Sequence, residues 1–382
     1  AEACILQCSL HTSSGEFEEA QAYMEEVIRI GESTEQHQAT LFGMTHLAST
    51  LTFLTRFDEA LEQAERTLTR AQELEEPKFQ AELLTFAIPI AHLQRGNSAA
   101  ATEALERGME IALRIGDRAS ETYGALLQGK AAMMQGDLEA GLALLHRSIE
   151  ASDATGLPFM IATSRGVTCG GYLQIGAPML HRALDLITET LQLMEAPTGR
   201  TNGAWLWSEL GACALAAGQI DQAEELFKLA LTEQTAPMYL MRPAALLGAC
   251  HVAIARDQLD DARTHYEEAA EYVTSHQMEN DQLALKFTGA HLEAANDNHE
   301  AALALLEDCE TLAGPELRRV LLDVLAARAQ SLDALGRTDD ATSTRTRAQS
   351  VADEIAALIR DEELRAAFQQ GTRSLLSPVP TS

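Results

Sequence analysis

Residues 207–230 read WSELGACALAAGQIDQAEELFKLA, and this stretch decides how the chain folds. Apolar residues recur at helical spacing on both sides of the short segment GQIDQA, which begins at Gly218. Such spacing places the apolar side chains on one face of an α-helix. The stretch therefore predicts two helices joined by a tight turn.

The turn segment has counterparts along the whole chain, so the helix pair is a repeating unit. Successive copies begin 39 to 42 residues apart. A nearly fixed period of this length is typical of an array whose units stack on one another. The copies are GEFEEA at 15, TRFDEA at 55, GNSAAA at 96, GDLEAG at 136, GAPMLHRA at 176, GQIDQA at 218, DQLDDA at 257, DNHEAA at 297 and GRTDDA at 336.

Each copy carries residues suited to the junction of two helices. A Gly or Asn-like residue accepts the left-handed conformation that ends the first helix. The acidic residues that follow interact favourably with the positive end of the second helix. A small residue then allows close helix approach; in order it is Ala20, Ala60, Ala101, Gly141, Ala183, Ala223, Ala262, Ala302 and Ala341. One turn later a larger apolar residue fills the gap, as in Met24, Leu105, Leu145, Phe227, Tyr266 and Leu306.

The composition favours an all-α protein and limits its partners. The 382 residues include only 2 Trp, 6 Tyr and 10 Phe, and good helix formers such as Ala, Leu, Glu and Gln predominate. Lys and Arg number 28 against 57 Asp and Glu, which gives a net charge of −29. Because so acidic a chain is poorly suited to contact phosphate groups, we expect neither nucleic acid nor membrane as a direct partner. No apolar run is long enough to span a bilayer.

The repeating unit resembles the tetratricopeptide repeat (TPR). The family's order of large, large, small, turn, small, large and small residues is matched by Trp207, Leu210, Gly211, Gly218, Ala223, Phe227 and Ala230. The period of about 40 residues exceeds the family's usual length, and armadillo and HEAT arrays are the alternative. The resemblance implies an all-α, right-handed α-solenoid superhelix of about nine repeats over residues 1–338. Capping helices over 339–370 and a disordered tail over 371–382 complete the expected organisation.

Lengthened repeats of this kind resemble the regulatory arrays of bacterial signalling ATPases, nucleotide cyclases and transcriptional activators. The segment IAALIRDEELRAAF at 355–368 resembles the closing helices of such proteins. The chain begins without Met and lacks the features of a secretory signal. We therefore expect a C-terminal region of a larger cytoplasmic protein. Six cysteines without a CxxC pair agree with a reducing compartment.

In the TPR family, the first helix of each unit lines a concave groove. Carrying the family's groove-facing positions over to this sequence gives a surface that is largely apolar and neutral at its middle. The set comprises Thr45, Ser49, Phe86, Ile90, Leu93, Tyr123, Leu126, Lys130, Met133, Trp205, Ser208, Leu215, Leu247, His251, Phe287, His291, Asp323, Gln330 and Asp333. Co-chaperone members hold a terminal carboxylate with Lys and Asn at these positions. Here Lys130 has no accompanying Asn, so that clamp is not expected.

Two places depart from the repeat. Pro89 lies inside the first helix of the third unit, where it removes a backbone hydrogen bond and bends the helix. The fifth unit has two extra residues in its spacing, together with Pro178 and the glycines Gly166, Gly170, Gly171 and Gly176. We expect the superhelix to change pitch or hinge there.

His251 and His291 occupy the same position in neighbouring units and should lie side by side in the groove. They either bind an acidic or aromatic ligand and respond to pH, or are surface histidines beside carboxylates such as Glu293. The cysteines, including Cys4 and Cys8, fall at helix-packing positions, so we interpret them as core residues rather than metal ligands.

No motif of a nucleophile elbow, a P-loop or a zinc protease is present, and we expect neither an enzyme nor a cofactor. The sequence predicts a scaffold that binds a peptide, a partner helix or a small effector in its concave groove. The alternative is a free-standing acidic assembly scaffold or adaptor that binds basic partners through its charged surface.

Overall fold

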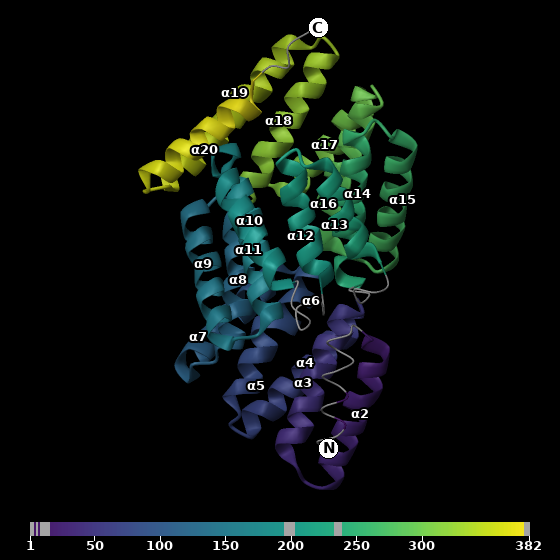
Figure 1. The fold of residues 1–382 in the computed structure, drawn as a ribbon, viewed down its shortest axis with the longest axis vertical. Coiled ribbons are helices and arrows are strands. Elements are labelled where there is room, and N and C mark those ends of the chain that lie inside the picture. The colour runs from purple at the N-terminus through teal and green to yellow at the C-terminus, as the bar shows by residue number, and fades with distance from the viewer. Residues whose placement is uncertain (1–3, 5–6, 8–15, 195–202, 233–238, 378–382) are drawn as a thin grey trace.

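The computed structural model describes residues 4, 7, 16–194, 203–232 and 239–377, which form helices joined by short turns (Figure 1). The described residues contain no β-strand. Helices adjacent in sequence pack as antiparallel pairs, so the predicted all-α solenoid is confirmed.

Each repeat consists of a first and a second helix. The first helices are α3 (His37–Phe53), α5 (Pro77–Glu82) with α6 (Ile88–Gln94), α8 (Arg118–Gln135), α10 (Pro158–Ile175), α12 (Gly203–Ala216), α14 (Arg242–Ala255), α16 (Gln282–Ala295) and α18 (Arg318–Ala334). The second helices are α2 (Phe17–Ser33), α4 (Phe57–Glu73), α7 (Ser98–Ile115), α9 (Leu138–Thr155), α11 (Leu180–Met194), α13 (Ile220–Leu231), α15 (Leu259–Ser275), α17 (His299–Ala313) and α19 (Thr338–Leu358). Short turns of 3-10 helix, η2 (Ala177–Met179), η4 (Tyr239–Met241) and η5 (Glu279–Asp281), precede α11, α14 and α16, and α20 (Glu362–Leu375) closes the array.

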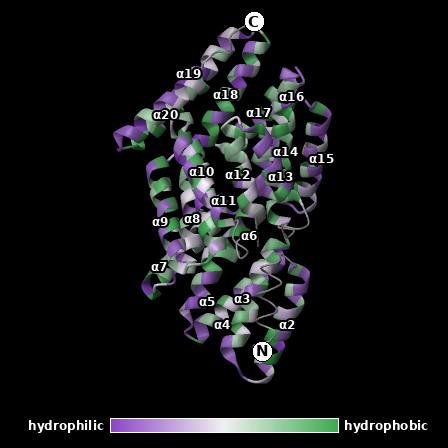
Figure 2. Ribbon diagram, in the orientation of Figure 1, coloured by the Kyte–Doolittle hydropathy of each residue, from purple (hydrophilic) through white to green (hydrophobic). Residues whose placement is uncertain are grey.

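The two helices of a unit differ in how they are buried. First helices such as α3 and α10 bury residues around most of their circumference, whereas second helices such as α4 and α15 bury one face. In Figure 2 hydrophilic residues predominate along outer helices such as α15 and α19. The first helices therefore form the inner layer and the second helices the outer layer.

The described turns between paired helices adopt the predicted left-handed conformation except in the fifth unit, where Gly176 has φ 129° and ψ 176°. Gly96, Gly136, Gly218 and Gly336 have φ values of 72°, 86°, 73° and 71°. Three units lack this glycine, and there Thr55, Asp257 and Asp297 adopt φ values of 57° to 60°. The same turn geometry is therefore imposed even on residues that pay a conformational penalty for it. The first copy of the turn begins at Gly15, outside the described residues.

The predicted contact between a small and a large residue also forms. All eight alanines of the small set are at most 1% exposed, and Gly141 is buried. In the unit quoted first, the Phe227 ring occupies the space left by two glycines: a Cβ on Gly211 or Gly248 would lie 2.8 Å or 2.1 Å from it. Side-chain volume on one helix thus matches the missing side chains on its neighbours.

Pro89 and the glycine-rich fifth unit, the two places that depart from the repeat, differ in their effect on the helices. Before Pro89 the helix widens into one π-helical turn, η1 (Leu83–Ala87), and α6 starts at Ile88. The proline therefore interrupts the regular helix as predicted. In the fifth unit, a Cβ on Gly166 would lie 2.6 Å from Leu206 and one on Gly171 would lie 2.7 Å from Leu145. These glycines allow neighbouring helices to approach closely, which is a packing role and not evidence of a hinge.

The superhelix closes on itself along a line of contacts that we call the seam. Arg95 Nη1 donates to the carbonyl oxygens of His276 and Gln277, at 3.3 Å and 3.2 Å. These partners are separated by 181 and 182 residues, or about four and a half repeats. Successive turns of the superhelix are therefore in direct contact.

The seam continues toward the C-terminus through backbone-directed bonds. Arg318 Nε donates to Gln135 O at 3.0 Å, and Arg319 Nε donates to Gln174 O at 2.6 Å. The Glu139 carboxylate accepts from the backbone N–H groups of Arg360 and Asp361, at 2.5 Å and 3.2 Å. Because charged groups satisfy the otherwise unpaired ends of helices and turns, these bonds hold the cap against the middle of the chain.

Two helices, α19 and α20, close the array, and α20 extends to Leu375, beyond the expected boundary at 370. The extension is held because Gly371 packs against Gly176, where an added Cβ would lie 3.1 Å from the neighbouring Cα. Residues 371–377 thus have defined structure instead of belonging to a disordered tail. The rest of the predicted tail, 378–382, lies outside the described residues.

Candidate functional site on the inner face

An ion pair between α8 and α12 marks the inner face of the superhelix. Lys130 Nζ lies 2.7 Å from Glu209 Oε1, and the side chains are 39% and 18% exposed. The two helices belong to units four and six, and α10 lies between them in sequence. First helices two units apart converge only on the concave side of a solenoid, because curvature separates them on the convex side.

A glycine on α10 makes room for this ion pair. A Cβ on Gly170 would lie 3.1 Å from Glu209 Oε2, the oxygen that does not accept from Lys130 in the 2.7 Å hydrogen bond. A side chain at this position would crowd the carboxylate. The glycine-rich fifth unit therefore contributes directly to the arrangement of charges on the inner face.

A cluster of imidazole and aromatic rings lies further along the same face. The rings of His251 and His291 meet edge to face with centroids 5.4 Å apart, and the Phe287 ring lies 4.5 Å from that of His291. The His251 Nε2 and the Thr288 hydroxyl are hydrogen-bonded at 3.1 Å. The predicted juxtaposition of the two histidines is confirmed. Glu293 is bonded to Arg263 and Asn298.

Burial keeps both imidazoles neutral near pH 7. Loss of hydration lowers the pKa of His251 to about 4, and the neighbouring His291 contributes in the same direction. Burial also lowers the pKa of His291, while the Asp323 carboxylate opposes that shift. A neutral imidazole offers one donor and one acceptor. This part of the inner face therefore presents hydrogen-bonding groups without net charge.

A buried carboxyl group lies where the seam meets the inner face. Burial raises the pKa of Asp281 to about 6, opposed by a hydrogen bond from Gln94 and by the charge of Lys130. Asp281 Oδ2 and Gln94 Oε1 are buried and have no hydrogen-bond partner within the described part of the chain. Buried acceptors normally have a partner, so these two oxygens are suited to donors from water or a ligand.

Aromatic rings connect α2 with the first helices of the next three units. The ring centroids are 5.0 Å apart for Phe17 and Phe53, 5.3 Å for Phe53 and Phe86, and 4.8 Å for Phe86 and Tyr123. These distances fall in the range of favourable aromatic pairs. Burial raises the pKa of the Tyr123 hydroxyl, and the Glu82 carboxylate adds to the shift. The ladder is mainly a packing feature, with Tyr123 at its inner end.

The structure divides the predicted groove residues into two groups. Those buried with at most 6% exposure are Thr45, Phe86, Ile90, Leu126, Met133, Ser208 and Leu247. Side chains in this group are inaccessible to a groove ligand, because the closed superhelix packs its inner layer into one continuous core. Residues with accessible surface are Ser49, Leu93, Tyr123, Lys130, Leu215, His251, Phe287, His291, Asp323, Gln330 and Asp333. The Trp205 side chain lies outside the described residues.

Sequence reasoning missed Glu209, Asp281 and Gln94. Glu209 directly follows the predicted groove residue Ser208, but nothing in the sequence around Glu209 indicates that it pairs with Lys130, 79 residues away. Asp281 and Gln94 meet only because the superhelix closes, so no local pattern could have paired them.

The described cysteines are mostly buried, and the described residues contain neither a group suited to hold a metal ion nor a membrane-spanning helix. Cys169, Cys213, Cys250 and Cys309 are fully buried, in agreement with their interpretation as core residues, and Cys4 is half-buried. Cys8 lies outside the described residues. Among the residues that the structure describes, no group of three His, Cys, Asp or Glu side chains is arranged to hold a metal ion. None of the described helices has the length and apolar character needed to cross a bilayer.

Comparison with known proteins supports the repeat assignment. A family model described as tetratricopeptide repeat matches residues 2–73. A Rap protein complexed with competence and sporulation factor has a similar fold, with a TM-score of 0.62 and 13% sequence identity. That alignment covers 94% of this chain and 99% of the Rap chain. The family match thus covers residues 2–73, and the described residues beyond it continue the same helix-turn-helix solenoid fold. No match to this array was found among curated protein sequences.

Two further solved structures resemble this chain in fold. The apo form of the quorum sensor NprR from B. thuringiensis has a TM-score of 0.51 and 14% identity, covering 90% of this chain and 98% of that chain. A monomeric mutant of IFIT1 with m7Gppp-AAAA has a TM-score of 0.53 and 14% identity, covering 97% of this chain and 84% of that chain. At these identities, the similarity establishes a shared fold.

Proposed function

We propose that this TPR array is a non-catalytic scaffold that binds a peptide segment or a helix of a partner protein on its inner face. The proposal rests on one observation: the first helices of units four and six to nine carry half-buried polar and aromatic side chains on the inner face. These side chains are Tyr123, Lys130, Glu209, His251, Phe287, His291 and Asp323.

The chemistry of this row suits reversible recognition of a polypeptide. Lys130 and Glu209 retain exposed surface and can exchange their mutual contact for charged groups of a ligand. The neutral histidines offer donors and acceptors of the kind that pair with peptide groups, and Phe287 provides an apolar contact. An interior already shaped and buried reduces the entropy lost when a ligand binds.

The wider role that we propose is regulatory. The array would be the sensor region of a larger cytoplasmic protein of bacterial signalling or transcription control, and its occupant would be a peptide, a partner helix or a small effector. The similar folds of the Rap protein complexed with competence and sporulation factor and of the quorum sensor NprR support this role. The IFIT1 structure contains m7Gppp-AAAA, but the net charge of −29 argues against direct nucleic-acid binding by this chain.

A peptide selection followed by two matched charge reversals tests the proposal. Peptides selected from a random phage-display library against the full chain would be synthesised and their affinities measured by calorimetry. We expect Lys130→Glu to weaken the selected peptides at least about tenfold, since it places two carboxylates together on the inner face. Lys228→Glu is the control, because Lys228 also pairs with a glutamate at 2.7 Å but lies on the outer helix α13.

The salt dependence of binding separates the proposal from the acidic-scaffold alternative. Inner-face binding that includes apolar contacts should persist when the salt concentration is raised, whereas contacts led by surface charge weaken steeply. Peptides that lose affinity equally in Lys130→Glu and Lys228→Glu, and are released by salt, would contradict the inner-face proposal and favour an adaptor for basic partners.

A further inference from the structure

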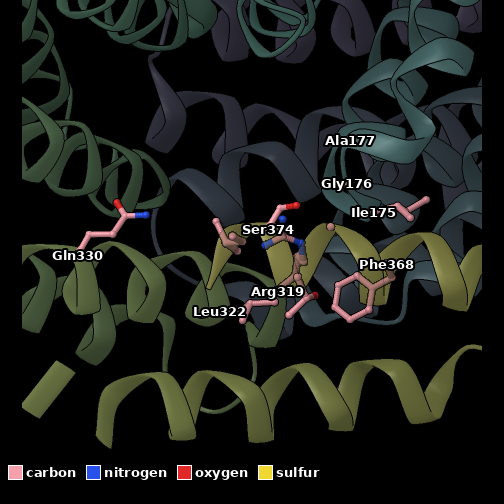
Figure 3. A pocket seen from close by; sticks show the side chains of 11 residues that line it. Ile175, Gly176, Ala177, Arg319, Leu322, Gln330, Phe368 and Ser374 are labelled. Atoms are coloured by element: carbon pink, nitrogen blue, oxygen red, sulfur yellow. The ribbon is translucent and has the colours of Figure 1, made fainter. Parts of the chain in front are cut away.

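A cavity of about 440 Å³ lies between the fifth unit and the C-terminal cap. The end of α10 with the following turn, the helix α18 and the helix α20 contribute its lining (Figure 3). Ile175, Leu322, Phe368 and Leu375 supply apolar surface. The volume is in the range of small-molecule sites. Exposed Ala177 and Ser374 belong to the lining, so the cavity can be reached from solvent.

One cation belongs to this lining. Arg319 is the charged residue among the 11 that line the cavity, and its side chain is 12% exposed. Figure 3 shows it between Gln330 on one side and Phe368 on the other. Its Nε donates to Gln174 O, and its Nη1 lies 2.6 Å from Asp323 Oδ1. These contacts fix the guanidinium in place, and its fork of five N–H donors has further capacity for a ligand.

A second polar group in the lining lacks a partner. Thr372 is 5% exposed, and its Oγ1 has no hydrogen-bond partner within the described chain. Other helical threonines, such as Thr168 and Thr188, donate to the carbonyl oxygen four residues earlier. A buried hydroxyl without a partner costs free energy. An acceptor that occupies the cavity would relieve that cost.

We propose that this cavity binds a small monocarboxylic acid with a compact apolar body. The carboxylate would accept from the Arg319 guanidinium and the Thr372 hydroxyl, and the apolar body would contact Ile175, Leu322 and Phe368. An arginine matches the planar geometry of a carboxylate better than it matches a neutral amide. Asp323 pairs with Arg319 and also belongs to the inner-face set, but Lys130, on which the test of the proposed function depends, does not line the cavity, so the two proposals can succeed or fail independently.

The position of the cavity gives the ligand a structural consequence. The three lining segments meet at the seam, where Arg319 already connects α18 to the end of α10. A ligand that contacts all three segments binds the closed superhelix better than an opened one. It should therefore raise the thermal midpoint of unfolding, because it stabilises the state to which it binds.

Calorimetry with phenylacetate and isovalerate on the full chain tests the proposal, with phenylacetamide as the uncharged comparison. We expect the carboxylates to bind at least about tenfold more tightly than the amide and to raise the thermal midpoint. Ala177→Phe, which fills the exposed rim, should abolish binding. Arg319→Lys and Thr372→Val should weaken it by about tenfold and about threefold.

Arg318→Gln is the matched control. Arg318 donates from Nε to a backbone carbonyl at the same seam, but it does not line the cavity. Its loss should leave the preference of the cavity for the carboxylates over the amide unchanged, because Arg318 does not contact the ligand. The proposal is overturned if neither carboxylate binds at about 10 mM, if the amide binds as tightly, or if Ala177→Phe binds as well as the unaltered chain. Ala177→Phe keeps the test decisive should Arg319→Lys fail to fold.

Discussion

Adding a single methyl group at Gly248 tests how the helices of units six and seven fit together. The new Cβ would lie 2.1 Å from Phe227 Cε1 and 2.2 Å from Cζ, whereas carbon atoms in contact are normally about 3.5–4.0 Å apart. The ring cannot simply turn away, because Gly211 lies against the same edge of it. A Cβ built on Gly211 would lie 2.8 Å from the same two ring atoms. Phe227 is 2% exposed, so there is no solvent side into which it can move.

The expected cost follows from two opposing terms. Overpacking of a dense core costs typically about 1–3 kcal/mol, and the severity of this contact favours the upper end. Replacing a helical glycine by alanine returns about 0.5–1 kcal/mol through chain entropy. We expect Gly248→Ala to lower the free energy of unfolding by about 2 kcal/mol.

A double-mutant cycle isolates the cause. Phe227→Leu alone should destabilise by removing buried ring carbons, but in the Gly248→Ala background it should also remove the clash. The double variant should therefore be more stable than the sum of the single effects by about 1–2 kcal/mol. Urea unfolding would be followed by circular dichroism and by tryptophan fluorescence, since Trp207 lies on α12 beside this contact. Strictly additive effects, or a Gly248→Ala chain as stable as its parent, would refute the packing argument.

Three further predictions follow from backbone conformation and titration. Gly218→Ala should lower the free energy of unfolding in urea by about 1 kcal/mol through φ strain alone, since its Cβ would meet nothing within 4 Å. Asp257→Gly, at φ 60° on an exposed turn, should raise that free energy by a similar amount. Changes of the same sign in the two variants would contradict the reasoning. The folded pKa of Asp281 is raised from 3.8 to about 6, so the contribution of this group to stability is lost as the pH rises through this interval. The free energy of unfolding of Asp281→Asn should therefore increase by roughly 1–3 kcal/mol relative to the parent between pH 4 and pH 7. Urea unfolding at each pH measures this difference. The folded pKa of His251 is lowered from 6.5 to about 4, so the unfolded chain binds more protons than the folded chain between these pH values. Stability should therefore fall as the pH decreases from 6.5 to 4, and His251→Gln should flatten this dependence. An unchanged slope in His251→Gln would refute the prediction.

Local features of the fold could be predicted because they depend on residues close in sequence. The turn that begins at Gly218, the close contact at Ala223 and the ring of Phe227 all lie within one helix pair, and each has the predicted environment. The contact between His251 and His291 could also be predicted, because the two residues occupy the same position in neighbouring units, one repeat length apart. Helical periodicity and a constant period are sufficient for such inferences.

The pitch of the superhelix was decided by tertiary structure alone. It is the sum of small rotations between many stacked units, so a slight change in each interface moves distant residues by a large amount. Packing between neighbouring helices buried Phe86 and Met133, which were predicted to face an open groove: the Phe86 ring lies 5.3 Å from Phe53 and 4.8 Å from Tyr123, and Met133 packs against Gly141. Curvature of the inner layer brought Lys130 to Glu209, and closure after about four and a half repeats brought Gln94 to Asp281 and α20 against the end of α10, where the cavity formed. The repeat pattern by itself therefore determined the unit and its stacking, whereas the accumulated twist determined which side chains remain available for a ligand.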